Sequence, residues 1–216
     1  MAGQTDTLVN TLLAEIDAGH LSPGDVIDEH VLIDRHNVSR TPVREAMIKL
    51  ESAGLIQRLP RKGATVFKPT LEEFLAILEV HAQLEGQAAG LAARRLSKRH
   101  AQALEQATQA CEAHARTHGD AHPDLYYQLN LDFHRVVAEA AGNPFLLDMI
   151  KTNARKLMAY YRARYRYAGV IAASAQEHRE IATLITARRS REAEAAMAAH
   201  VSFDHVTAMD LLAALD

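Results

Sequence analysis

Histidine is the residue type in this sequence that offers the most chemistry, because 12 of the 216 residues are histidines. Asn130 and His134 are four residues apart, so on a helix they share one face. His178 and His200 lie in later segments with helical patterns. Three imidazoles from three helices, together with an oxygen ligand, could hold a transition-metal ion of the Zn, Ni or Mn type. The spacing alone is also typical of ordinary surface or core histidines.

A second group of chemically informative residues is basic and lies between Arg35 and Lys68. This stretch has eight lysines and arginines against two acids, a local charge of +6, although the whole chain has a formal charge of −3. The residues before it contain seven acids and no lysine or arginine. The total charge argues against nucleic-acid binding, but its distribution predicts a positive surface on one part of the chain.

Three short helices and a hairpin are predicted to carry these bases. The helices are expected at about 5–18, 28–36 and 39–53, and the strands at 55–59 and 64–67. The third helix has an inward stripe, which consists of Val43, Ala46, Met47 and Leu50. Its outward side is expected to carry Arg40, Thr41, Arg44 and Lys49, while Ser39 and Thr41 at the helix start can bind phosphate. Such a helix start fits the major groove, and a hairpin tip with Arg61, Lys62 and Gly63 fits the minor groove.

The chain after residue 68 is predicted to be almost entirely helical, because glycine and proline are rare and good helix formers dominate. Six helices are expected, at about 71–95, 98–117, 123–141, 144–166, 174–187 and 190–213. The expected fold is therefore mainly α. A winged helix-turn-helix DNA-binding domain at 1–68 precedes an antiparallel all-helical bundle at 69–216, which would bind the effector and dimerise.

The basic region resembles the DNA-binding domain of GntR-family transcriptional regulators. The similar residues are Val38 to Ala46, Leu50-Glu51, Gly54-Leu55-Ile56 and Arg61 to Ala64. The resemblance implies base contacts from Arg40 and Arg44, phosphate contacts from Ser39 and Thr41, and minor-groove contact from Lys62 and Gly63. His30 stands where some relatives have another DNA-binding arginine.

The helical region is similar to the effector domain, called the FCD domain, of the FadR branch of that family. The similar residues are Asn130-x-x-Phe133-His134, Ala141 to Pro144, Glu177-His178 and Ala195-Ala196-Met197-x-x-His200. Many such domains hold a divalent metal with one aspartate and three histidines, and the metal helps to bind a small carboxylate. The resemblance implies His134, His178 and His200 as ligands, with Asn130 as a neutral, weaker ligand in place of the acid.

The same resemblance implies an effector-binding position. His81 stands about where many relatives have an arginine that clamps the carboxylate of the effector, and a neutral imidazole binds a carboxylate less well. The effector is therefore expected to be less acidic, or to meet an arginine of the group 155, 162, 164 and 166. Arg162 is the preferred candidate, although such a run is also typical of a solvated or dimer-facing surface.

These features predict a ligand-responsive transcriptional regulator that is not an enzyme. A homodimer and a palindromic double-stranded operator are expected, because one recognition helix reads too few base pairs for useful specificity. A repressor is expected, since repression relieved by ligand is common in the similar family. The first ten residues lack a signal-peptide pattern and no 18-residue segment is apolar, so a cytoplasmic location without a membrane partner is expected.

Two other functions fit the same residues. A metal-dependent hydrolase would need a general base, for which Glu177 is the obvious candidate. A metal-free bundle would serve for dimerisation only, and its histidines would have no effect on metal content. The single cysteine, Cys111, is expected to be a small buried residue.

Overall fold

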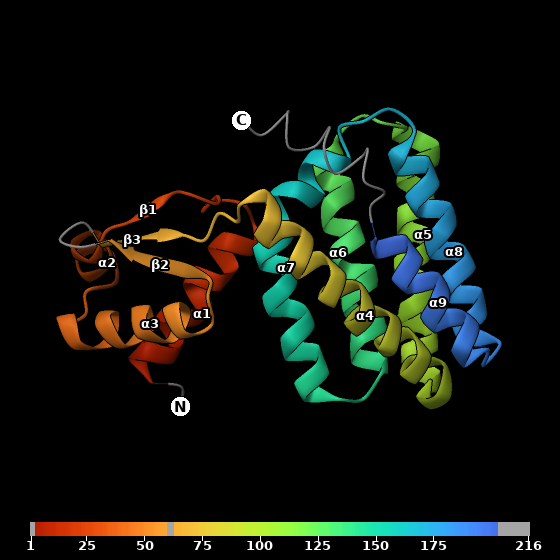
Figure 1. The fold of residues 1–216 in the computed structure, drawn as a ribbon, viewed down its shortest axis with the longest axis horizontal. Coiled ribbons are helices and arrows are strands. Elements are labelled where there is room, and N and C mark those ends of the chain that lie inside the picture. Colours follow the sequence, from red (N-terminus) through yellow and green to blue (C-terminus); the bar gives the residue numbers. More distant parts are fainter. Residues whose placement is uncertain (1–2, 60–62, 203–216) are drawn as a thin grey trace. The chain divides into compact units, whose positions relative to one another are not determined.

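The structure is a computed structural model, and it describes residues 3–59 and 63–202. The chain divides into two compact units, Met1–Thr70 and Leu71–Asp216. They are called the N-terminal unit and the helical unit below, and Figure 1 shows the elements of each. The mainly helical fold class predicted from the sequence is confirmed. Among the helices of the described ranges, none has the length and apolar content needed to cross a membrane.

The N-terminal unit is a winged helix-turn-helix. Its elements are α1 (Gln4–Asp17), β1 (Val26–Ile27), α2 (Glu29–His36), α3 (Arg40–Ser52), β2 (Ile56–Leu59) and β3 (Gly63–Val66). Asp28 caps α2 by accepting hydrogen bonds from two backbone N–H groups, and Asn37 ends that helix in the left-handed conformation. The predicted inward stripe of α3 is buried, and α3 packs against α1. These contacts fix the orientation of the first turn of α3.

The prediction missed strand β1, because two residues are too few to show an alternating pattern. Val26 pairs with Thr65 and Ile27 with Ala64, so the sheet has the antiparallel order β1-β3-β2. Gly63 has a φ of +83°, and a Cβ atom there would lie 2.4 Å from the carbonyl oxygen of Ile27. Glycine at this position is therefore required by the sheet itself.

The helical unit contains six helices within the described residues. They are α4 (Leu71–Arg95), α5 (Lys98–His118), α6 (Pro123–Ala140), α7 (Pro144–Arg164), α8 (Val170–Thr186) and α9 (Ser190–Val201). Helix α8 begins four residues earlier than predicted, directly after Gly169. Ile171 is fully buried there, so packing outweighs the low helix propensity of β-branched residues. The predicted continuation of the last helix from 203 to 213 lies outside the described residues.

Helices α4 and α9 pack closely because two glycines lie between them. A Cβ atom at Gly86 would be 2.8 Å from the carbonyl oxygen of Glu194 and 3.1 Å from the Cβ of Ala198. At Gly90, one turn later, a Cβ atom would meet the side chain of Glu194 and the carbonyl oxygen of Ser190. The glycines thus let the first helix of the unit approach the backbone of α9.

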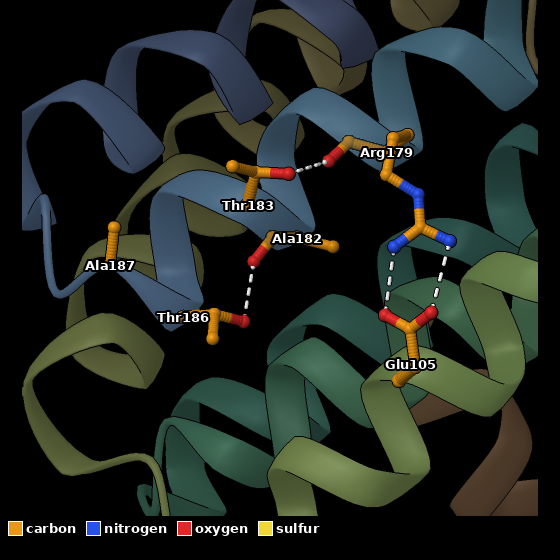
Figure 2. A pocket seen from close by; sticks show the side chains of 6 residues that line it. All are labelled: Glu105, Arg179, Ala182, Thr183, Thr186 and Ala187. Carbon is orange, nitrogen blue, oxygen red and sulfur yellow. Dashed lines mark hydrogen bonds and ion pairs between the residues drawn. The ribbon is translucent and has the colours of Figure 1, made fainter.

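Helix α8 is joined to α5 by a charged cluster at the surface. The Arg179 guanidinium donates to the carboxylates of Glu105 and Glu112, with the shortest distances at 2.7 Å. Figure 2 shows the Arg179–Glu105 pair beside a surface hollow of about 340 Å³. The hydroxyls of Thr183 and Thr186 in this hollow donate to backbone carbonyls one turn earlier. The polar side chains that line it are therefore engaged within the protein.

Candidate metal centre and DNA-binding surface

Three histidines converge inside the helical unit. His134 of α6, His178 of α8 and His200 of α9 each offer a ring nitrogen, and these atoms lie within 4.8 Å of one another. The Nε2 atoms of His178 and His200 are 3.0 Å apart. Neighbouring ligands have about this separation around an ion that binds each nitrogen at about 2.1 Å. The structure thus brings together the three histidines that the sequence predicts as ligands.

The rings of this cluster are held by packing as well as by their helices. Phe133 stacks on His178, with ring centroids 3.9 Å apart and an angle of 16° between the planes. His178 and His200 are buried, while His134 is half-buried. Burial lowers the pKa of His178 well below its ordinary value, and it lowers that of His200 to about 4. Both rings are therefore neutral near neutral pH, which is the form that binds metals.

Asn130, the predicted oxygen ligand, lies one turn before His134 on the same helix. It is buried, and its Oδ1 accepts a hydrogen bond from the Tyr165 hydroxyl at 2.8 Å. A carbonyl oxygen has two lone pairs, so this bond leaves one for a further partner. The Tyr165 bond fixes the amide in one orientation.

The sequence reasoning missed Glu85, a carboxylate on α4 that is only 2% exposed. Its Oε2 lies 3.3 Å from Nδ1 of His134, and its Oε1 lies 3.7 Å from Nε2 of His81. Burial acts to raise the pKa of Glu85, but the neighbouring histidines, His134 above all, outweigh it and hold the pKa below its ordinary value. The sequence signal that could have identified Glu85 is its position as a charged residue on the inward face of α4, which also carries Ala82 and Gly86.

His200, although buried, is one of the residues that line a surface hollow. The hollow has a volume of about 240 Å³, and its lining includes Glu177, Glu180 and His200. Oε2 of Glu177 accepts a hydrogen bond of 2.6 Å from Nδ1 of His200. Two carboxylates beside this opening favour the entry of a cation. The general base that a hydrolase would need is thus bonded to a histidine of the cluster.

The two predicted effector residues lie in different surroundings. His81 is 3% exposed and faces the carboxylate of Glu85. Arg162 makes two hydrogen bonds to the carboxylate of Asp124, at 2.8 and 3.0 Å, and its guanidinium lies 6.0 Å from the ring centre of Tyr127. A carboxylate ligand would have to meet the negative charge of Glu85 at the first position and displace Asp124 at the second.

The first turn of α3 presents the predicted DNA-contacting residues on the surface. Ser39, Arg40, Thr41 and Arg44 are all exposed. Ser39 makes no side-chain hydrogen bond to the helix that it precedes, which leaves its hydroxyl for another partner. Arg44 is 63% exposed and its Nε lies 3.6 Å from a carboxylate oxygen of Glu29, a contact that an exposed pair gives up at little cost. Lys62, predicted at the wing tip, lies outside the described residues.

Lys49, expected on the same outward surface, is instead turned toward α1. Its Nζ donates to Oδ1 of Asp6 at 2.7 Å. Other bases of the region are also paired, since Arg35 contacts Glu15 and Arg58 contacts Glu51. Asp6 and Glu15, two of the acids before residue 35, therefore neutralise part of the local charge of +6. Among the described bases of this region, Arg40 and Arg44 lie exposed at the start of α3.

The N-terminal unit is a winged helix whose third helix begins with exposed basic residues, and the helical unit contains a histidine cluster. Together these features define a class of winged-helix regulators that have a second, helical domain. Residues 4–66 match the model of bacterial regulatory proteins of the gntR family, and residues 76–203 match the FCD domain. The chain belongs to the GntR family of bacterial regulatory proteins and carries an FCD domain.

Named relatives agree with this family. An HTH-type transcriptional regulator from the TAR-I ttuE-ttuC' intergenic region of Agrobacterium vitis is 33% identical over 88 residues, or 41% of this chain and 52% of the relative. The HTH-type transcriptional repressor RspR of Escherichia coli K12 is 45% identical over 53 residues, or 24% of this chain and 23% of the relative. The matched stretches thus span about half or less of these curated relatives.

Two solved structures share the fold over almost the whole chain. E. coli McbR/YncC superposes with a TM-score of 0.80 at 18% identity and covers 100% of both chains. A GntR transcriptional regulator from Rhodococcus sp. RHA1 superposes with a TM-score of 0.72 at 17% identity and covers 99% of both. At these identities the likeness concerns the fold alone.

Proposed function

We propose that this protein is a ligand-responsive transcriptional repressor that binds a palindromic double-stranded operator as a homodimer in the cytoplasm. The observation that carries the DNA-binding part is the exposed start of α3, where two arginines and two hydroxyls lie within six residues. Arg40 and Arg44 would contact bases, since arginine bonds guanine through two acceptors in the major groove. Ser39 and Thr41 would bind phosphate at the helix start, and Lys62 and Gly63 would contact the minor groove.

DNA binding is tested by measuring affinity for the best duplex selected from a random pool, by fluorescence anisotropy. Arg40→Ala is expected to weaken binding by about 5- to 150-fold, the loss of one specific base contact of about 1–3 kcal/mol. Lys49→Ala is the matched control, because Lys49 lies on the same helix but bonds Asp6. Equal affinities for the wild type, Arg40→Ala and Lys49→Ala would contradict the proposed surface.

We further propose that the helical unit binds a divalent transition-metal ion through His134, His178 and His200, with Asn130 as a weaker ligand. The observation that supports the ion is the convergence of three ring nitrogens, two of them on neutral, buried rings. When bound, the ion supplies a positive charge that can hold a small carboxylate effector. His81 already faces Glu85 and Arg162 already bonds Asp124, so the carboxylate would meet the ion in preference to either side chain.

Native mass spectrometry of the purified chain tests this second part, because it reports the oligomer, the ion and any ligand together. The expected result is a dimer with one divalent ion for each chain. His134→Ala is expected to lose the ion and the dependence of DNA binding on the effector, while its dimer persists. Unchanged metal content in His134→Ala would refute the metal centre and favour a bundle that only dimerises.

A further inference from the structure

Two of the three clustered histidines have a carboxylate on the ring nitrogen named Nδ1. The Nδ1 atom of His200 donates to Glu177 at 2.6 Å, and Nδ1 of His134 lies 3.3 Å from Oε2 of Glu85. These carboxylates come from different helices, α8 and α4. A carboxylate on Nδ1 fixes the hydrogen there and leaves Nε2 as the lone-pair atom. In the case of His200, that Nε2 atom is the one 3.0 Å from Nε2 of His178.

The contact between Glu85 and His134 is buried in the helical unit. Glu85 is 2% exposed, and its Oε2 lies 3.3 Å from Nδ1 of His134. Neither of these two buried atoms makes a hydrogen bond within the described residues. A buried carboxylate without full pairing costs free energy, and a cation bound by the neighbouring histidines would offset this cost. The close approach of α4 and α9 at Gly86, the next residue, holds this carboxylate on the side of α4 that faces the bundle interior.

Charge balance gives a second reason for the two carboxylates. Three neutral imidazoles and the neutral amide of Asn130 leave the two positive charges of a divalent ion uncompensated. Glu85 and Glu177 together carry two negative charges on the far sides of the ligand rings, and Glu85 does so away from water. They would offset the absence of an acidic ligand at position 130.

We propose that Glu85 and Glu177 are positioning residues of the metal centre, which orient His134 and His200 so that their Nε2 atoms bind the ion. Glu85 lies behind His134, on the bundle interior side, and Glu177 lies behind His200, beside the solvent-facing hollow. This assignment rests on the proposed metal centre. It assigns neither carboxylate as a ligand of the ion.

The test is the affinity of the full-length chain for Zn²⁺, measured by competition with a chromophoric chelator. Glu85→Gln and Glu177→Gln are each expected to weaken Zn²⁺ binding by about 10- to 100-fold. The loss should be larger for Glu85, because the side chain of Glu177 is 42% exposed and that of Glu85 is 2% exposed. Glu180→Gln is the matched control, since Glu180 lines the same hollow as Glu177 and bonds Gln176.

A nitrogen-15 NMR spectrum of the Zn²⁺-loaded wild type shows which ring nitrogen of each histidine carries hydrogen and which binds zinc. A purely structural role of Glu85 and Glu177 would not determine this arrangement. His134 and His200 are expected to carry hydrogen on Nδ1 and zinc on Nε2. If Glu85→Gln does not fold, this spectrum and the Zn²⁺ affinity of Glu177→Gln test the proposed positioning role.

Zn²⁺ affinities of both variants equal to that of Glu180→Gln would overturn the assignment. A loss of affinity confined to one variant would overturn it for the other residue. A wild type that binds no Zn²⁺ would instead overturn the proposed metal centre.

Discussion

Replacing Gly86 with alanine is expected to destabilise the helical unit, although alanine is the better helix former. Helix propensity alone predicts a gain of about 1 kcal/mol for this change in the interior of α4. The structure predicts the opposite sign, because the new Cβ atom would lie 2.8 Å from the carbonyl oxygen of Glu194. Carbon and carbonyl oxygen normally meet at about 3.3 Å or more, so α4 and α9 would have to separate by about 0.5 Å.

The size of the effect follows from what the methyl group meets. Overpacking in a closely packed interior costs about 1–3 kcal/mol, and here the obstacle is backbone, which cannot rotate away. After subtraction of the propensity gain, a net loss of about 1 kcal/mol remains. For a chain of this size, that loss corresponds to a decrease of about 2–4 °C in Tm. Because His200 lies on α9, Zn²⁺ affinity should fall as well.

The assay is thermal unfolding followed by circular dichroism, with a chelator present so that metal does not contribute. Gln87→Ala is the control, since Gln87 is exposed on the same helix and its replacement changes no packing. Gly90→Ala should have an intermediate effect, because its nearest obstacle is the mobile carboxylate of Glu194. A Tm for Gly86→Ala equal to or above that of the wild type would refute the close approach of α4 and α9.

Two further predictions concern the charged cluster on α8 and the single cysteine. Arg179→Met should lower the free energy of unfolding by about 1 kcal/mol near neutral pH, a value limited by the exposure of Glu105 and Glu112. Hydrogen bonds from Arg179 lower the pKa of both carboxyls below 4.5, so urea titrations should show the difference above that pH and its loss below the lowered pKa values. The Cys111 thiol is fully buried, which raises its pKa to about 12, so a thiol reagent should label it far faster in urea than in the native protein. Rapid labelling of the native protein would contradict that burial.

The sequence predicted the parts of the fold that have strong periodicity. Helix α4 begins and ends where predicted, and the apolar stripe of α3 is buried. Strand β1 and the four-residue extension of α8 were missed, because two residues show no period and Ile171 is helical through tertiary packing. The position of Glu85 depends on the approach of α4 to α9, a contact more than 100 residues apart in the chain. The acidic residue on the inward face of α4 was the available signal for Glu85, and the sequence alone did not predict the contact with α9.

The order of strands in the N-terminal unit has a consequence for how the chain folds during synthesis. Strand β3 is the last of the three to be made, yet it lies in the middle of the sheet between β1 and β2. Neither β1 nor β2 can therefore pair before β3 has been synthesised, since each forms its backbone hydrogen bonds with β3. When α3 leaves the ribosome, β1 still has no partner, and the sheet can close only after Val66 emerges. A truncated DNA-binding fragment that stops before Val66 would lack part of the sheet's central strand.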